Sequence, residues 1–228
     1  MYKKYTYQVK SGTEALIIAL HELSAKKVII PSYTCLDILN AVNEVGCEYH
    51  LSDCGLDLQI DVDDVFRVAD DYDTIIIPHM FGIRADVKTI KEKTNLKIIE
   101  DLSQCHGLVG LGKYADIVIS STNKSKWIDF KRGGFVFSDK IMQLPLYNFD
   151  ELKTTIQSNL IKRTELSTEI KNAGVNLIGN ESSWLRGMYF TDHSKREPYI
   201  PLHKIVGGLG CYKINSYIGK VDWVSIIV

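Results

Sequence analysis

Two apolar runs in the middle of the chain lead into polar residues that could do chemistry. The runs at residues 97–99 and 117–119 are followed by a Glu-Asp pair ending at Asp101 and a Ser-Ser pair ending at Ser121. Short apolar runs bounded in this way predict two buried strands. Lys126 follows five residues after Ser121. Because ligands of open α/β sheets bind at the carboxyl ends of the strands, the spacing predicts a carboxylate and an amine in one site.

An acid and an amine at neighbouring strand ends suggest pyridoxal phosphate. This cofactor needs a lysine for its Schiff base, a carboxylate that keeps its ring nitrogen protonated, and amide and hydroxyl donors for its phosphate. Lys126, Asp101 and Ser121 could supply the amine, the carboxylate and a hydroxyl. Gly12 and Thr13 open an apolar helix whose N-terminal amides could bind the phosphate. The alternative is that the residues at this position only cap the helix.

At these positions the sequence resembles the DegT/StrS family of fold-type I, pyridoxal-phosphate-dependent sugar aminotransferases. Five motifs occur in the family's order over residues 11–138: Ser11-Gly12-Thr13-Glu14-Ala15-Leu16, Pro31-Ser32-Tyr33-Thr34-Cys35, Pro78-His79-Met80-Phe81-Gly82, Glu100-Asp101 with Gln104 and His106-Gly107, and Ser121 to Lys126 followed by Gly133-Gly134. Relatives place the Schiff-base lysine five residues after the serine and seven or eight before the paired glycines. The resemblance therefore implies Lys126, with Lys124 as the alternative that fails the first spacing.

The resemblance also implies further contacts with the cofactor. Asp101 matches the carboxylate that pairs with the pyridinium nitrogen, and Gln104 matches a family position that hydrogen-bonds the cofactor. Many relatives stack an aromatic ring on the cofactor where this chain has Cys35. Tyr33, Cys35 or another residue could cover the ring, and Tyr33 could equally be a core residue. The sequence leaves these alternatives open.

Two histidines are expected on the substrate side of the site. His79 follows an apolar strand pattern at residues 74–78 and matches a family motif, although a lone histidine is as readily structural. His203 ends a Tyr-Ile-Pro-Leu-His stretch that resembles a loop near the substrate in relatives. Both residues are therefore predicted substrate contacts.

Strand and helix patterns alternate along the first two thirds of the chain, which predicts an α/β fold with a mainly parallel, doubly wound sheet. The resemblance to fold-type I aminotransferases implies the same architecture. Past residue 139 the resemblance thins, and the chain is markedly shorter than its relatives. We predict a cofactor-binding α/β domain over residues 1–148 and a small, reduced C-terminal lobe over residues 149–228.

Composition narrows the classes of partner. The 228 residues are 45% hydrophobic and carry a formal net charge of −1, which gives no electrostatic reason to expect a nucleic acid. No apolar run is long enough for a membrane span and no signal peptide is evident, so a cytoplasmic protein without membrane partners is expected. The five cysteines include no Cys-x-x-Cys pair, which indicates neither a disulfide framework nor a metal site.

The resemblance implies an aminotransferase that moves an amino group from an amino-acid donor, glutamate, to a nucleotide-linked keto sugar. Such reactions serve the biosynthesis of amino sugars and polysaccharides, and family members work as homodimers. One alternative is a sugar dehydratase on the same scaffold, and Lys126 favours transamination over it. Another is a non-catalytic member that binds cofactor or sugar nucleotide; the short terminal regions and Cys35 motivate it, and the retained Asp101, Gln104 and Ser121 argue against it.

Overall fold

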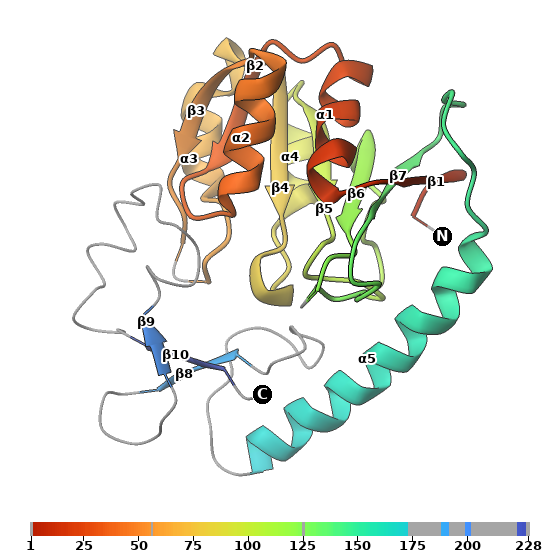
Figure 1. Cartoon of the computed structure of the whole chain (residues 1–228). Helices are drawn as coiled ribbons and strands as arrows, with labels where there is room; N and C mark the ends of the chain where they lie inside the picture. The colour runs from red at the N-terminus through yellow and green to blue at the C-terminus, as the bar shows by residue number, and fades with distance from the viewer. Residues whose placement is uncertain are drawn as a thin grey trace.

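The computed structural model describes residues 2–55, 57–124, 126–172, 188–191, 199–201 and 223–226. Within them lie a seven-stranded sheet with helices on both faces and a three-stranded sheet (Figure 1). The strands of the large sheet are β1 (Tyr5–Val9), β2 (Lys27–Pro31), β3 (Glu48–Ser52), β4 (Thr74–Pro78), β5 (Lys97–Asp101), β6 (Ile117–Ser121) and β7 (Gly134–Ser138). The helices are α1 (Gly12–Glu22), α2 (Leu36–Val45), α3 (Val62–Val68), α4 (Val87–Lys93) and α5 (Phe149–Asn172), with short 3-10 turns η1 (Ala69–Asp71) and η2 (Met80–Gly82).

The large sheet has the strand order β1-β7-β6-β5-β4-β2-β3. The five strands from β3 to β6 in this order are parallel, whereas β7 is antiparallel to β6 and to the edge strand β1. This arrangement confirms the predicted α/β fold with a mainly parallel sheet. The carboxyl ends of β4, β5 and β6 therefore meet along one edge, where ligands of such sheets bind.

Two hydrophobic cores lie on the two faces of the sheet. One lies under α1 and α2 and includes Ile99 and Ile119. The other lies under α3, α4 and the first half of α5 and includes Ile98 and Val118. Successive side chains of a strand point to opposite faces, so β5 and β6 contribute side chains to both cores. This explains why both strands are apolar without alternation.

The described part of the chain beyond α5 contains three strands in a sheet of order β8-β10-β9, namely β8 (Met188–Thr191), β9 (Tyr199–Pro201) and β10 (Trp223–Ile226). Both pairings in this sheet are antiparallel. α5 packs against the large sheet through Phe149, Leu152 and Ile156. The division at residue 149 stays a prediction. No helix among the described residues is both long and apolar enough to cross a membrane.

Candidate active site

Two glycines let the N-terminus of α1 lie against the end of β6 and the start of β7. A Cβ atom on Gly12 would lie 2.5 Å from the Cβ of Ser121, and one on Gly134 would lie 2.6 Å from the carbonyl oxygen of Ser11. The helix can approach the strand this closely only because both residues are glycine. Ser11 caps the helix, since its Oγ accepts a hydrogen bond from the N–H of Glu14 at 3.0 Å. The first N–H groups of a helix have no partner within it, so this junction is suited to an anion.

Ser103 joins the ends of β5 and β6 beside this junction. Its Oγ donates to Asp101 Oδ1 at 2.5 Å and accepts from the N–H of Ser121 at 2.8 Å. The N–H of Ser103 donates to the same oxygen of Asp101 at 2.8 Å. Oδ2 of Asp101 has no hydrogen-bond partner among the described residues. The carboxylate is therefore held through one oxygen, and the other remains available to a ligand.

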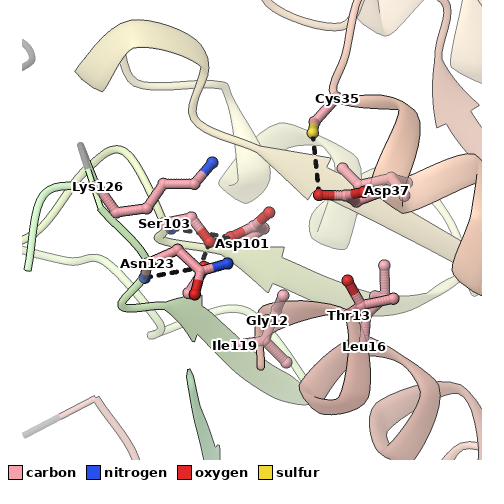
Figure 2. Close-up of a pocket in the computed structure, with 12 residues that line it drawn as sticks. Gly12, Thr13, Leu16, Cys35, Asp37, Asp101, Ser103, Ile119, Asn123 and Lys126 are labelled. Carbon is pink, nitrogen blue, oxygen red and sulfur yellow. Dashed lines mark hydrogen bonds between the residues drawn. The ribbon is translucent and has the colours of Figure 1, made fainter. Parts of the chain in front are cut away.

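Lys126 lies in the turn after β6, where its N–H donates to the carbonyl of Asn123 at 3.1 Å. Figure 2 shows the side chains of Lys126 and Asp101 projecting into the same space, with α1 and α2 on the other side of it. In the part of the chain that the structure describes, Nζ of Lys126 forms no hydrogen bond or ion pair. The pocket is lined by Gly12, Thr13, Leu16, Cys35, Asp37, Ile38, Asp101, Ser103, Ile119, Ser121, Asn123 and Lys126.

Of the two residues considered for covering a ring in this pocket, Cys35 lines it and Tyr33 is in the core. Tyr33 is 2% exposed, and its ring centroid lies 6.1 Å from that of Phe81. Cys35 Sγ donates to Asp37 Oδ2 at 3.6 Å. Burial raises the pKa of the Cys35 thiol, with the charge of Lys126 acting in the opposite direction, so the thiol is neutral at physiological pH. The structure favours Cys35 as the pocket-facing residue.

A second, adjoining pocket contains Gln104 and His79. Gln104 Oε1 accepts from the N–H of Phe81 at 2.6 Å, which fixes the side chain beside the site. This pocket shares five lining residues with the first: Cys35, Ile38, Asp101, Ser103 and Lys126. Gln104 is thus placed next to the other predicted cofactor contacts, with its amide nitrogen still able to donate.

The structure engages both ring nitrogens of His79 inside the protein, and its predicted contact with substrate stays a prediction. Its Nδ1 accepts from the N–H of Ala85 at 3.0 Å, so the proton lies on Nε2, which donates to Glu100 Oε1 at 2.8 Å. Glu100 Oε2 accepts from the N–H of Gly112 at 3.0 Å. Both ring nitrogens of His79 are engaged inside the protein, and the residue is 1% exposed. These bonds fix the ring of His79 at the edge of the second pocket.

On the face opposite the pocket, His106 lies in a buried chain of hydrogen bonds. The N–H of Gly107 donates to the Tyr2 hydroxyl at 3.1 Å, and that hydroxyl donates to His106 Nδ1 at 3.0 Å. His106 Nε2 then donates to Ser120 Oγ at 2.9 Å, and Ser120 donates to the carbonyl of Ser121 at 3.3 Å. Burial lowers the pKa of His106 to about 3, which keeps the ring neutral. Because the Ser120 hydroxyl donates to the Ser121 carbonyl, His106 Nε2 carries the proton and Nδ1 accepts from Tyr2.

The pocket also contains residues that sequence reasoning did not single out, namely Ser103, Asn123 and Asp37. Ser103 was the most accessible to prediction, because a serine two residues after an aspartate at a strand end readily bonds to it. No local signal marked Asp37, which enters the pocket because α2 packs beside α1. The predicted substrate contact His203 lies outside the described residues.

The sequence has relatives among characterised enzymes. A model described as the DegT/DnrJ/EryC1/StrS aminotransferase family matches residues 1–143. Over 134 residues the chain is 34% identical to the 3-oxo-glucose-6-phosphate:glutamate aminotransferase of Bacillus subtilis (strain 168), a match that covers 55% of this chain and 30% of that protein. It is 30% identical over 122 residues to the dTDP-3-amino-3,6-dideoxy-alpha-D-galactopyranose transaminase of Aneurinibacillus thermoaerophilus, which covers 48% of this chain and 32% of that enzyme. The matches thus span about a third of the length of these two relatives.

Solved structures share the fold. The crystal structure of NtdA from Bacillus subtilis with bound cofactor PMP superposes with a TM-score of 0.66 at 25% identity, covering 83% of this chain and 55% of that one. A structure described as a putative PLP-dependent aminotransferase from Bacillus cereus ATCC 10987 has a TM-score of 0.73 at 15% identity and covers 98% of this chain and 81% of that one. The second likeness supports the fold alone.

Proposed function

Because the chain belongs to the DegT/DnrJ/EryC1/StrS aminotransferase family, we propose that its pocket binds pyridoxal phosphate and transfers amino groups to a keto sugar. One observation carries this proposal: a single pocket brings together Lys126, Asp101, Ser121 and the first residues of α1. The donor set fits the cofactor. It offers an amine, a carboxylate oxygen without a partner, and a helix N-terminus that a glycine brings into contact with a serine.

When bound, the cofactor supplies an electron sink for bonds at the substrate carbon. Gly12 and Thr13 present N–H groups at the positive end of α1, and Ser121 adds a hydroxyl, which together bind the phosphate. Asp101 Oδ2 would accept a hydrogen bond from the protonated ring nitrogen, whose positive charge would in turn keep the carboxylate ionised. Nζ of Lys126 would hold the cofactor covalently and, as a free amine, would carry a proton to and from the substrate carbon.

We infer that glutamate is the amino donor and that the acceptor is a keto sugar bearing a phosphate, either as a sugar phosphate or as a nucleotide sugar. The names of the two relatives support this choice, since one names glutamate and an oxo sugar phosphate and the other a dTDP sugar. We further propose a cytoplasmic homodimer that serves amino-sugar or polysaccharide biosynthesis. Only the family supports these last points.

The first test is the visible absorption spectrum of the purified protein with pyridoxal phosphate, before and after borohydride. We expect a band of lysine-linked cofactor, with the reduced adduct mapped to Lys126 by mass spectrometry. Lys126→Ala should remove the band, whereas the matched control Lys124→Ala should retain it. Absence of the band from the wild type would overturn the proposal and favour a non-catalytic family member.

The second test is transfer from glutamate to 3-oxo-glucose 6-phosphate and to a dTDP-linked 3-keto sugar. Sustained formation of 2-oxoglutarate with only one of the two acceptors would show whether the site prefers a sugar phosphate or a nucleotide sugar. Cofactor linked to Lys126 without transfer to either acceptor would support a binding role in place of transamination.

A further inference from the structure

α5 contacts the loops that carry the candidate site from the opposite face of the sheet. A Cβ atom on Gly107, in the loop after β5, would lie 3.2 Å from Ile156 Cγ2 and 3.3 Å from Leu160 Cδ2, so the helix packs directly on this loop. Asn159 Nδ2 donates to the carbonyl of Trp127, in the loop after β6, at 3.0 Å. Figure 1 shows α5 as the long helix beside the ends of these strands. One helix therefore touches both loops.

These contacts form a single stripe along α5. Ile156, Asn159, Leu160 and Arg163 stand at positions i, i+3, i+4 and i+7 and so share one side of the helix. Arg163 extends the stripe by one turn beyond Asn159, and its Cζ lies 4.1 Å from the centroid of the Trp127 ring. Asn159 thus holds the backbone of Trp127 while Arg163 stacks on its ring.

Arg163 is buried, and the stack on Trp127 is its principal contact among the described residues. The residue is 2% exposed, and none of its three nitrogens has a hydrogen-bond partner within the described residues, which is also true of Trp127 Nε1. Burial lowers the pKa of Arg163 to about 9, so the guanidinium is still charged at neutral pH. A buried charge without a counter-ion is costly, and the electron-rich face of an indole is the group that offsets part of this cost.

Trp127 is adjacent in sequence to the amine of the site. Its ring packs in the core beneath α5, whereas Lys126 lines the pocket on the side of α1. The N–H of Trp127 donates to the carbonyl of Ser103 at 3.1 Å, which ties it to the group that holds Asp101. We propose that Asn159 and Arg163 are positioning residues that anchor Trp127 and thereby keep Lys126 directed into the pocket. This inference rests on the proposed function for the role of the lysine.

The anchor can be tested without cofactor by hydrogen–deuterium exchange of residues 122–130. The variants are Asn159→Leu, which removes the donor at similar volume, and Arg163→Ala, which removes the stack. We expect at least tenfold faster exchange of this peptide in each variant, because the N–H groups of Lys126 and Phe130 donate within the loop and that of Trp127 donates to Ser103, so their protection depends on the loop staying in place. Exchange in β7 should be unchanged.

Matched controls replace exposed residues of the same helix, Gln157→Leu and Lys162→Ala, and should exchange like the wild type. Arg163→Lys should restore part of the protection, since it keeps a cation over the ring. Should Arg163→Ala fail to fold, Asn159→Leu and Arg163→Lys still decide the matter. Exchange within twofold of the wild type in Asn159→Leu and in the folded Arg163 variants would overturn the inference.

A second measurement follows the rate at which added pyridoxal phosphate becomes linked to Lys126, trapped with borohydride. We expect this rate to fall about tenfold in Asn159→Leu and Arg163→Ala and to recover partly in Arg163→Lys. If the wild type forms no link at all, the proposed function fails, while the exchange experiment still decides whether α5 anchors the loop. If the link forms equally fast in every variant, the positioning role is wrong and the proposed function stands.

Discussion

Strands β5 and β6 each end in two adjacent polar residues, and the two residues of each pair point to opposite faces of the sheet. Glu100 and Ser120 point toward the core under α3, α4 and α5, where they bond His79 and His106. The next residues on each strand, Asp101 and Ser121, point toward α1 and line the pocket. The buried pair makes a satisfied network, whereas the pocket side leaves a carboxylate oxygen without a partner among the described residues. Neighbouring polar residues can therefore divide between support and chemistry.

Four predictions test this difference between the buried face and the pocket face. Among them, Asp101→Asn should have the largest effect on activity. The neutral amide can still accept from Ser103, but it cannot stabilise a protonated ring nitrogen. We expect kcat/KM for amino transfer to fall by on the order of 100-fold, equivalent to about 3 kcal/mol. Urea unfolding serves as the control and should change by less than about 1 kcal/mol. Full activity in this variant would remove Asp101 from the chemistry.

Glu100→Gln should show the reverse pattern, with stability lost and the site retained. Its amide nitrogen would face the donor of either His79 or Gly112, so one buried N–H would lose its acceptor. We expect a loss of about 2–3 kcal/mol in the free energy of unfolding. The exposed Glu92→Gln on α4 is the control and should change it by less than about 0.5 kcal/mol. Equal stability of the two variants would contradict the contrast.

His106 should make stability depend on pH. In the unfolded chain its pKa is near 6.5, whereas in the fold burial lowers the pKa to about 3, so only the unfolded state gains a proton between these values. The contribution is fully present above the unfolded pKa and is lost as the pH falls toward 3. From pH 7 to pH 5 the wild type should lose about 2 kcal/mol more than His106→Gln. Parallel pH profiles of urea unfolding would show that the ring is not held neutral.

The two serines that end β6 provide the finest comparison. Ser120→Ala leaves His106 Nε2 without its acceptor and should cost about 1 kcal/mol of stability, with cofactor affinity unchanged. Ser121→Ala removes the proposed phosphate donor and should raise the Kd for pyridoxal phosphate by roughly fivefold, also about 1 kcal/mol. Equilibrium dialysis measures the cofactor affinity of both variants, and urea unfolding measures their stability. Identical changes in the two would mean that the faces are not distinct.

Much of the site could be predicted because its residues sit at the ends of strongly patterned elements. Apolar runs fixed where β5, β6 and α1 end or begin, and this placed Asp101, Ser121 and Gly12 at the carboxyl edge of the sheet. The resemblance to the family, through its spacing from Ser121, then implied Lys126, which lines the same pocket. Such inferences rest on local periodicity and on the general position of ligands in parallel sheets.

The sequence by itself thus determined the fold class, the family and which residues stand at the strand ends. Tertiary structure alone decided that Cys35 rather than Tyr33 faces the pocket, that His79 is engaged by Glu100, and that Trp127 lies under α5. The physical reason is that local patterns set the type and length of each element. The face that a side chain occupies, and what it meets there, depend on packing between segments far apart in the chain.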